Sequence, residues 1–225
     1  MSKVALCLIA TGKYDRFLPE CLRTAGECFL DGHDVTYFVF ADRLRPGENV
    51  VWRPTPHNPW PWPTLYRYHT MLQAKKELLQ HDYLYYLDVD SRFVRPVGEE
   101  IFGDLVGTIH PGYAGQPKRN WTFETRPQSR ACVSRIDAQH YYCGGFQGGA
   151  AERWVRAMEE MAAMIDDDAA RGIVPVWHDE SIVNRYFLDN PPALSLSPDY
   201  CCYAHMRRDT RRIEIVGKNN GEFHR

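Results

Sequence analysis

The chain has 225 residues, enough for one large domain with a sizeable core. Its formal net charge is −2, and its lysines and arginines form no long block, so nucleic acid is not an expected partner. The 7 cysteines include no C-x-x-C and no zinc-ligand spacing, which favours reduced thiols in a cytosol over a disulfide framework. Aromatic residues make up 13%, which fits either core packing or stacking on sugar faces.

The first part of the chain predicts a β-α-β unit. Val4–Ile9 is a continuous apolar run, typical of a strand covered on both faces, and it is too short to cross a membrane. Asp15 is expected to cap a helix that runs to about Phe29, with Pro19 in its first turns. Val35–Phe40 follows as a second buried strand, which favours a parallel sheet.

A long proline-rich loop is predicted over Asp42–Pro63, and it carries Trp60 and Trp62. Loops of this length without regular structure are often functional. Thr64 is then expected to begin a helix that ends at Leu79. The side chains of this helix that are expected to face inward are Leu65, Tyr68, Leu72 and Leu79.

The second half of the chain contains two predicted helices, an amphipathic one over Ala151–Ile165 and another over Glu180–Leu188. Between them, Asp166–Asp168 has the form of a solvated helix end. No linker or internal repeat divides the sequence, so one domain over 1–225 is expected. The polar, basic tail over about 207–225 is predicted to be mobile until a substrate binds.

The most informative run is Tyr83–Leu87, a predicted buried strand that is followed by Asp88 and Asp90. In an α/β sheet, ligands lie at the carboxyl ends of the strands. Two carboxylates held there can bind a hard divalent cation that also grips phosphate oxygens. Asp-x-Asp alone is a weak signal, so its context has to support this interpretation.

Two further segments are candidates for chemistry. The glycine-rich run Tyr142–Gly149 lacks the spacings of a P-loop and of a dinucleotide-binding loop. It fits either a tight strand–helix turn or a close backbone approach to a ligand. Trp177–Glu180 precedes a predicted helix, where its two carboxylates can simply interact with the helix dipole. As a site, Trp177 would stack on a sugar, and Glu180 would face positive charge at an anomeric carbon.

Together these motifs resemble glycosyltransferase family 6, which contains the histo-blood-group A and B transferases and the α-1,3-galactosyltransferase. The resemblance runs from about Ile9 to Asn220. The segments that carry it are Asp88–Asp90, Gly107–Gly112, Arg126–Ser129, Tyr141–Phe146, Trp177–Ser181 and Leu196–Tyr200. It implies an α/β chain with the GT-A fold, in which helices flank a single Rossmann-like, mostly parallel sheet. It also implies a retaining enzyme that uses Mn²⁺ or another divalent cation, a UDP-sugar donor and an oligosaccharide acceptor.

The resemblance assigns roles residue by residue. Asp88 and Asp90 match the metal-binding pair, and Glu180 matches the catalytic carboxylate beside the anomeric carbon. Two retaining routes stay open: Glu180 forms a covalent intermediate, or it stabilises the oxocarbenium ion while the acceptor enters from the leaving-group side. The positions that match donor-binding residues are Ile9, Ala10, Thr11, Tyr14, Arg67, Val89, Cys143, Gly144, Gly145, Asp179 and Lys218. The positions that match acceptor-binding residues are His110, Thr122, Trp177 and Tyr203.

The departures from the family also bear on function. The sequence shows no N-terminal membrane anchor, so it resembles a cytoplasmic enzyme from a bacterium or its phage. Many bacterial relatives carry Asn-x-Asn, whereas Asp88 and Asp90 favour metal dependence. Tyr203 stands where the blood-group enzymes have aspartate, and the compact Cys143 and Gly145 favour UDP-GalNAc over UDP-Gal. The expected product is an α-1,3 linkage to a galactose that carries α-1,2-fucose. The alternatives are an inactive carbohydrate-binding protein of the same fold and another metal-dependent, nucleotide-using transferase.

Overall fold

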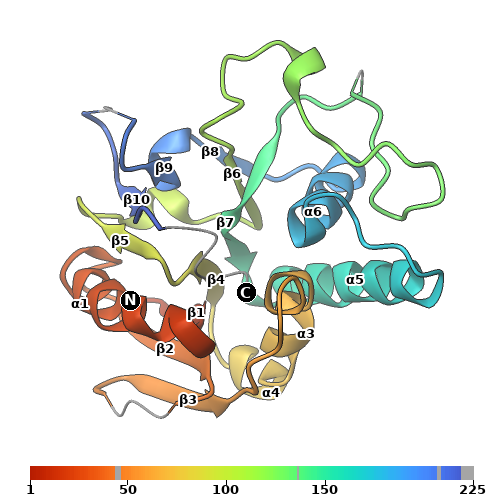
Figure 1. Cartoon of the computed structure of the whole chain (residues 1–225). Coiled ribbons are helices and arrows are strands. Elements are labelled where there is room, and N and C mark those ends of the chain that lie inside the picture. The colour runs from red at the N-terminus through yellow and green to blue at the C-terminus, as the bar shows by residue number, and fades with distance from the viewer. Residues whose placement is uncertain (44–46, 136, 207–208, 219–225) are drawn as a thin grey trace.

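A seven-stranded sheet forms the centre of the protein (Figure 1). The computed structural model describes residues 1–43, 47–135, 137–206 and 209–218. The strand order is β3-β2-β1-β4-β7-β6-β8, and only β7 runs antiparallel to its neighbours, β4 and β6. The strands are β1 Lys3–Ile9, β2 Asp34–Ala41, β3 Val50–Pro54, β4 Tyr83–Asp88, β6 Leu105–Ile109, β7 Tyr142–Ala150 and β8 Leu194–Leu196. This arrangement confirms the predicted α/β class with a mostly parallel sheet.

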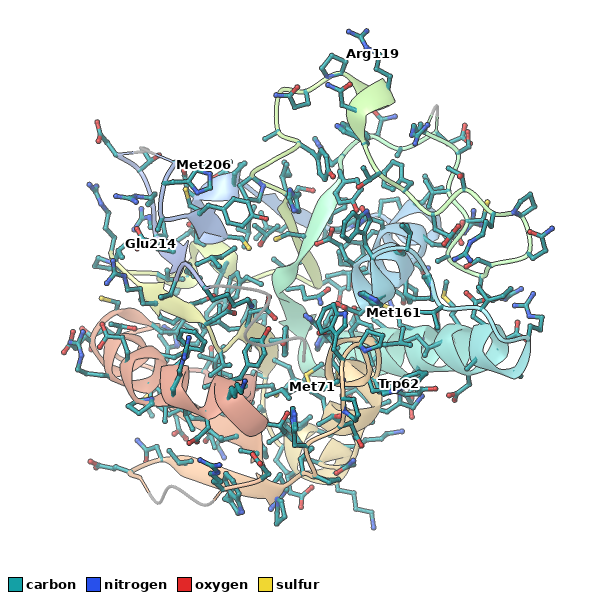
Figure 2. The ribbon with its side chains drawn as sticks, in the orientation of Figure 1. Trp62, Met71, Arg119, Met161, Met206 and Glu214 are labelled. Carbon is teal, nitrogen blue, oxygen red and sulfur yellow. The ribbon has the colours of Figure 1, made fainter. Side chains whose placement is uncertain are left out.

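Helices cover both faces of this sheet (Figure 1). One face carries α1 Leu18–Cys28, and the other carries α2 Trp62–Leu65, α3 Arg67–Leu72, α4 Lys75–Leu78, α5 Ala151–Ala170 and α6 His178–Asp189. Alternation along β1 feeds both cores, because Leu6 and Leu8 pack on the α1 side while Cys7 packs on the other. Figure 2 shows Met71 of α3 and Met161 of α5, which belong to that second core. In the described parts of the chain, no helix combines the length and the apolar character needed to cross a bilayer.

A second, three-stranded sheet lies beside the end of β4. It contains β5 Ser91–Phe93, β10 Ile213–Ile215 and β9 Cys202–Tyr203, with β10 in the middle. Just after β10, the amide of Val216 donates to the carbonyl oxygen of Asp90 at 2.7 Å. This pairing brings the C-terminal segment to the acidic pair. Of the tail that is predicted to be mobile, residues 207–208 and 219–225 lie outside the described residues, so its mobility stays a prediction.

The segment predicted as one helix from Thr64 to Leu79 is three short helices, α2, α3 and α4. Tyr66 and Ala74 interrupt the helical geometry, because their ψ angles of 23° and 18° lie outside the α-helical range. The interruptions rotate the end of the segment. Leu78 is therefore fully buried, and Leu79, which was expected inside, is 36% exposed.

Two other predictions in the N-terminal half were wrong. Asp15 does not cap α1, because it is buried inside a 3₁₀ turn, η1 Gly12–Phe17, that precedes the helix. The predicted loop Asp42–Pro63 contains β3, which pairs with β2 at the edge of the sheet. Pro54 is tolerated at the end of β3 because an edge strand does not need every backbone donor.

The glycine-rich run is a strand, so its interpretation as a tight turn was wrong. It forms β7, which is buried between β4 and β6. A side-chain carbon on Gly148 would lie 2.1 Å from the carbonyl oxygen of Leu84. One on Gly149 would lie 2.3 Å from the carbonyl oxygen of Asp104. Glycine is therefore required here by the close approach of the neighbouring backbones.

The acidic cluster in α5 is only partly solvated. Asp166 and Asp167 are exposed, as expected, but Asp168 is fully buried. Its carboxylate accepts hydrogen bonds from Ser129 Oγ at 2.6 Å, the Arg130 amide at 2.7 Å and Arg171 Nη2 at 2.9 Å. These bonds tie α5 to the long connection that precedes β7.

We expect Asp168→Ala to lower the free energy of unfolding by about 3 kcal/mol, because it leaves buried donors without an acceptor. Asp167→Ala is the matched control, since Asp167 is 52% exposed and makes only solvent-screened ion pairs. Its expected loss is below about 1 kcal/mol. Urea unfolding monitored by circular dichroism measures both. Equal losses in the two variants would contradict the buried role of Asp168.

Candidate functional site

A cleft of about 630 Å³ lies at the carboxyl ends of β1 and β4. The chain segments that close it are α2–α3, the start of β7, the start of α6 and the segment after β10. The predicted site residues that line it are Ile9, Thr11, Tyr14, Arg67, Asp88, Val89, Asp90, Gly144, Gly145, Trp177, Asp179, Glu180, Tyr203 and Lys218. A separate cavity of about 930 Å³ between α1 and the β2–β3 edge contains none of the predicted residues.

The acidic pair has the character of a cation site. Asp90 is 3% exposed, and burial followed by the charge of Asp88 raises its pKa. The Lys218 ammonium forms an ion pair with Asp90 Oδ2, so a cation already offsets part of this charge. Tyr86 Oη donates to Asp88 Oδ1 at 2.7 Å, which orients that carboxylate. The chemistry of these two carboxylates suits a hard divalent cation, which Asp88 and Asp90 would hold.

Protein side chains alone do not complete such a site. Among the described residues, no group of three or more His, Cys, Asp or Glu side chains is arranged to hold a metal ion. Asp88 and Asp90 would therefore hold the cation together with oxygens of a ligand or of water. That donor set is typical of a cation that binds with a phosphate group.

Arg67 connects three parts of the site. It is 5% exposed on α3, and its Nη1 donates to the Gly144 carbonyl oxygen at 2.6 Å. Its Nη2 lies 3.4 Å from Asp88 Oδ1, and its Nε lies 3.0 Å from Asp179 Oδ2. The guanidinium also lies over the Tyr86 ring, 4.4 Å from the centroid. Only a planar guanidinium can reach all of these groups at once.

Asp179 is a buried carboxylate that is paired with Arg67. It is 1% exposed and lines the cleft, and burial raises its pKa although Arg67 opposes that shift. Its buried Oδ2 receives no aligned hydrogen bond from the described residues, and it is held by the ion pair with Arg67.

Glu180 faces the same space from the first turn of α6. The Gly144 amide donates to its Oε2 at 3.0 Å, and the Tyr141 hydroxyl also donates to the carboxylate. Burial raises the pKa of Glu180 to about 7 against these bonds. The carboxylate is therefore fixed in position and poorly solvated, as a group that meets developing positive charge must be.

The turn into α6 separates Trp177 from Asp179. His178 between them has a φ of 53°, a left-handed conformation that costs a residue with a side chain about 1 kcal/mol or more. Trp177 is consequently 47% exposed at the mouth of the cleft, while Asp179 points inward. The His178 ring packs edge-on against Trp60, with the ring centroids 4.9 Å apart.

The segment before Trp177 is held by a buried carboxylate. Glu124 is 2% exposed, and its Oε2 accepts from the Val176 amide at 3.0 Å. Arg126 Nη2 donates to the Val174 carbonyl oxygen at 2.7 Å, and hydrogen bonds from Arg126 lower the pKa of Glu124 to about 2. The Glu124–Arg126 pair therefore positions Trp177 by holding the backbone of the residues that precede it.

Of the residues predicted to bind the nucleotide, some line the cleft and Ala10 does not. Thr11 and Tyr14 line the cleft, and the Lys218 ammonium lies 4.5 Å from the Tyr14 ring centroid. Ala10 is fully buried and does not line it, because its amide donates to the Phe40 carbonyl oxygen within the sheet. Ala10 therefore contributes only by fixing the backbone at the end of β1.

Three of the four predicted acceptor residues, His110, Thr122 and Tyr203, lie in one cluster, and of these three only Tyr203 lines the cleft. Tyr113 Oη and Thr122 Oγ1 share a hydrogen bond of 2.7 Å, and the Tyr113 ring lies 4.7 Å from the His110 ring. The ring of Tyr203 lies 6.2 Å from that of His110. Burial lowers the pKa of His110 to about 4, and its Nδ1 accepts from the Gly112 amide. Neutral His110 thus carries its proton on Nε2 and can donate there.

Residues of β7 face alternate sides of the site. A side-chain carbon on Gly144 would lie 2.9 Å from Asp179 Oδ2. One on Gly145 would lie 2.8 Å from Cys201 Sγ and 3.2 Å from Asp88 Oδ2. Cys143 shares the side of Gly145, is 3% exposed and does not line the cleft.

Several residues of the site were not predicted from the sequence. Tyr86 has the same strand face as Asp88, so period-2 alternation offered a signal for it. Tyr141, Tyr113 and Cys201 had no local signal, because tertiary packing brings them to Glu180, His110 and Gly145. That set of unpredicted residues is Tyr86, Tyr113, Tyr141 and Cys201.

Comparison with known proteins agrees with this geometry. Residues 2–222 match the family described as "Glycosyltransferase family 6". "Histo-blood group ABO system transferase 1" of Rattus norvegicus is 36% identical over 208 residues, which are 88% of this chain and 60% of that protein. "Globoside alpha-1,3-N-acetylgalactosaminyltransferase 1" of Homo sapiens is 34% identical over 208 residues, with the same two shares.

A bacterial relative is matched over more of its own length. "O-antigen biosynthesis glycosyltransferase WbnI" of Escherichia coli is 28% identical over 192 residues, which are 83% of this chain and 82% of that protein. By contrast, the chain spans about 60% of the length of the rat and human relatives. The family match, which covers nearly the whole chain, and the sheet order together show that the chain belongs to glycosyltransferase family 6 and has its GT-A fold.

Proposed function

We propose that the protein is a metal-dependent, retaining glycosyltransferase. It moves GalNAc, or Gal, from a UDP-sugar in α-1,3 linkage to a galactose-containing, α-1,2-fucosylated acceptor. The observation that carries the proposal is that Glu180 and the Asp88–Asp90 pair line one cleft. The same cleft therefore holds a carboxylate that can stabilise positive charge and an acidic pair that can hold a cation beside a phosphate group.

The donor would lie between the end of β1 and the end of β4. Thr11, Tyr14 and Val89 line the part of the cleft proposed for uridine. Asp88 and Asp90 would hold the cation beside the diphosphate, and Lys218 would contact the phosphate oxygens. When bound, a divalent cation supplies positive charge that offsets the charge developing on the departing diphosphate.

Glu180 would act at the anomeric carbon. As the bond between C1 and the diphosphate oxygen breaks, the sugar gains oxocarbenium character. The Glu180 carboxylate, fixed by the Gly144 amide and the Tyr141 hydroxyl, is preorganised to stabilise that charge. Asp179, which lines the cleft beside Arg67, would bind a hydroxyl of the donor sugar.

The acceptor would enter at the opposite end of the cleft. Trp177 offers an exposed indole face for a sugar ring. His110 would donate from Nε2, while Thr122 and Tyr203 lie in the same cluster. In the same-face route, a phosphate oxygen of the leaving diphosphate takes the proton of the attacking acceptor hydroxyl.

The relatives support the sugar and the linkage. The human relative that is named an α-1,3-N-acetylgalactosaminyltransferase is 34% identical to this chain, whereas the human "Alpha-1,3-galactosyltransferase 2" is 28% identical. We therefore propose UDP-GalNAc as the preferred donor and UDP-Gal as the weaker one.

The test is the structure of the product. The protein is incubated with Mn²⁺, an α-1,2-fucosylated galactoside and either donor, and the product is analysed by NMR. The expected product carries α-GalNAc on O3 of the galactose, with a higher kcat/KM for UDP-GalNAc. A β-linked product, or a higher kcat/KM for UDP-Gal, would contradict the corresponding part of the proposal.

We expect the pH dependence of turnover to follow Glu180. Because its pKa is raised to about 7, the carboxyl group is protonated and neutral below that pH and charged above it. Donor kcat/KM should rise about tenfold per pH unit up to about pH 7 and then level off. Initial rates from pH 5 to 9 measure this profile. A rate that stays constant down to pH 5 would contradict the assignment.

A further inference from the structure

The side of Gly145 on which a side chain would stand is covered by a residue from a distant part of the sequence. A side-chain carbon on Gly145 would lie 2.8 Å from Cys201 Sγ, closer than real contacts of this kind come. The same carbon would lie 3.2 Å from Asp88 Oδ2. The space next to Gly145 is therefore already filled by a thiol on one side and by a carboxylate of the acidic pair on the other.

Cys201 cannot easily retreat from this position. It is 3% exposed, and its amide donates to the Pro198 carbonyl oxygen at 3.1 Å. Its thiol also lies next to Cys143, which is two residues before Gly145 on the same side of β7. On either side of Cys201, the chain is held by packing of Tyr200 on Phe146 and by pairing of β9 with β10.

The thiol is thus a fixed, compact surface behind the part of the cleft that Gly145 lines. We propose that Cys201 is a specificity-determining residue for the donor sugar, because its Sγ sets how much space position 145 leaves for the substituent on the second carbon of that sugar. This inference rests on the proposed function and adds a residue to its donor site.

The proposal predicts coupling between positions 145 and 201. In Gly145→Ala, the new methyl group meets Cys201 Sγ and is pushed toward Asp88 and the cleft, so donor use should fall at least about tenfold. Removing the sulfur of Cys201 relieves the steric clash with the methyl group at position 145. Gly145→Ala combined with Cys201→Ala should therefore recover at least about tenfold in donor kcat/KM.

Two further variants serve as matched controls. Cys201→Ser keeps a heavy atom at the γ position, so it should recover much less activity in the Gly145→Ala background. Cys202→Ala makes the same chemical change at the adjacent, fully buried cysteine, whose Sγ instead contacts the carbonyl oxygens of Tyr203 and Met206. It should give no recovery.

The experiment measures kcat/KM for UDP-GalNAc and UDP-Gal in wild type and in each variant, with thermal unfolding to show that each is folded. The proposal is supported if, in the Gly145→Ala background, Cys201→Ala restores activity, Cys202→Ala does not, and the ratio of the two donors changes. The role of Cys201 is overturned if the wild type transfers the sugar but Cys201→Ala restores no activity to Gly145→Ala. It is also overturned if Cys202→Ala restores as much activity as Cys201→Ala. Absence of transfer by the folded wild type with both donors overturns the proposed function, and the role of Cys201 with it. If Gly145→Ala does not fold, Cys201→Ala alone still tests the role, since it must change the donor ratio.

Discussion

Glu180→Gln should reduce turnover at least about hundredfold while leaving the affinity for UDP unchanged within about threefold. Glutamine keeps the size of the side chain and an oxygen that can accept from the Gly144 amide. It removes the negative charge that would oppose the positive charge on the sugar ring. The loss should therefore appear in kcat rather than in binding of the nucleotide.

Initial rates and calorimetric titration with UDP measure the two effects separately. Glu152→Gln is the matched control, because it makes the same change at an exposed position in the first turn of α5. Near-normal turnover in Glu180→Gln would show that Glu180 does not face the anomeric carbon. Loss of UDP affinity in the same variant would indicate a structural role instead.

The double variant Asp88→Asn, Asp90→Asn should also lose at least about hundredfold in turnover, and its remaining activity should no longer respond to Mn²⁺. Amides are poor ligands for a hard cation compared with carboxylates. The change also removes the partner of Lys218. Chelation of the wild-type protein with EDTA should therefore have a similar effect on turnover.

A control for this change is Asp166→Asn, Asp167→Asn, which alters an exposed acidic pair on α5. Rates are measured across a Mn²⁺ titration for wild type and both double variants. Full activity of the wild type in EDTA would contradict metal dependence. So would an unchanged Mn²⁺ response in Asp88→Asn, Asp90→Asn.

The sequence predicted those parts of the fold that follow from local pattern. Continuous apolar runs marked β1, β2 and β4, and the strand before Asp88 predicted where the acidic pair would lie. β7 was missed because glycine has a low preference for strands, and its need for glycine comes from the neighbouring backbones of Leu84 and Asp104. Leu79 was misplaced because interruptions of a helix are set by tertiary packing.

In the site, too, local sequence pattern predicted some residues, whereas tertiary packing determines the contacts of others. Trp177, Asp179 and Glu180 were found because they lie together in one short segment at the start of α6. Arg67 was predicted near the donor, but its contacts with Gly144, Asp88 and Asp179 come from elements that are distant in sequence. Cys201 carried no local pattern, and only the packing of its loop against β7 reveals it.

The most direct test of the central claim is the release of UDP from UDP-GalNAc by the wild-type protein, measured together with the glycosylated acceptor. The account predicts that, with Mn²⁺ and a fucosylated galactoside, both form in equal amounts, and that EDTA or Glu180→Gln suppresses both. If the folded protein releases no UDP from UDP-GalNAc or UDP-Gal in the presence of that acceptor, the assignment of the cleft to glycosyl transfer is contradicted.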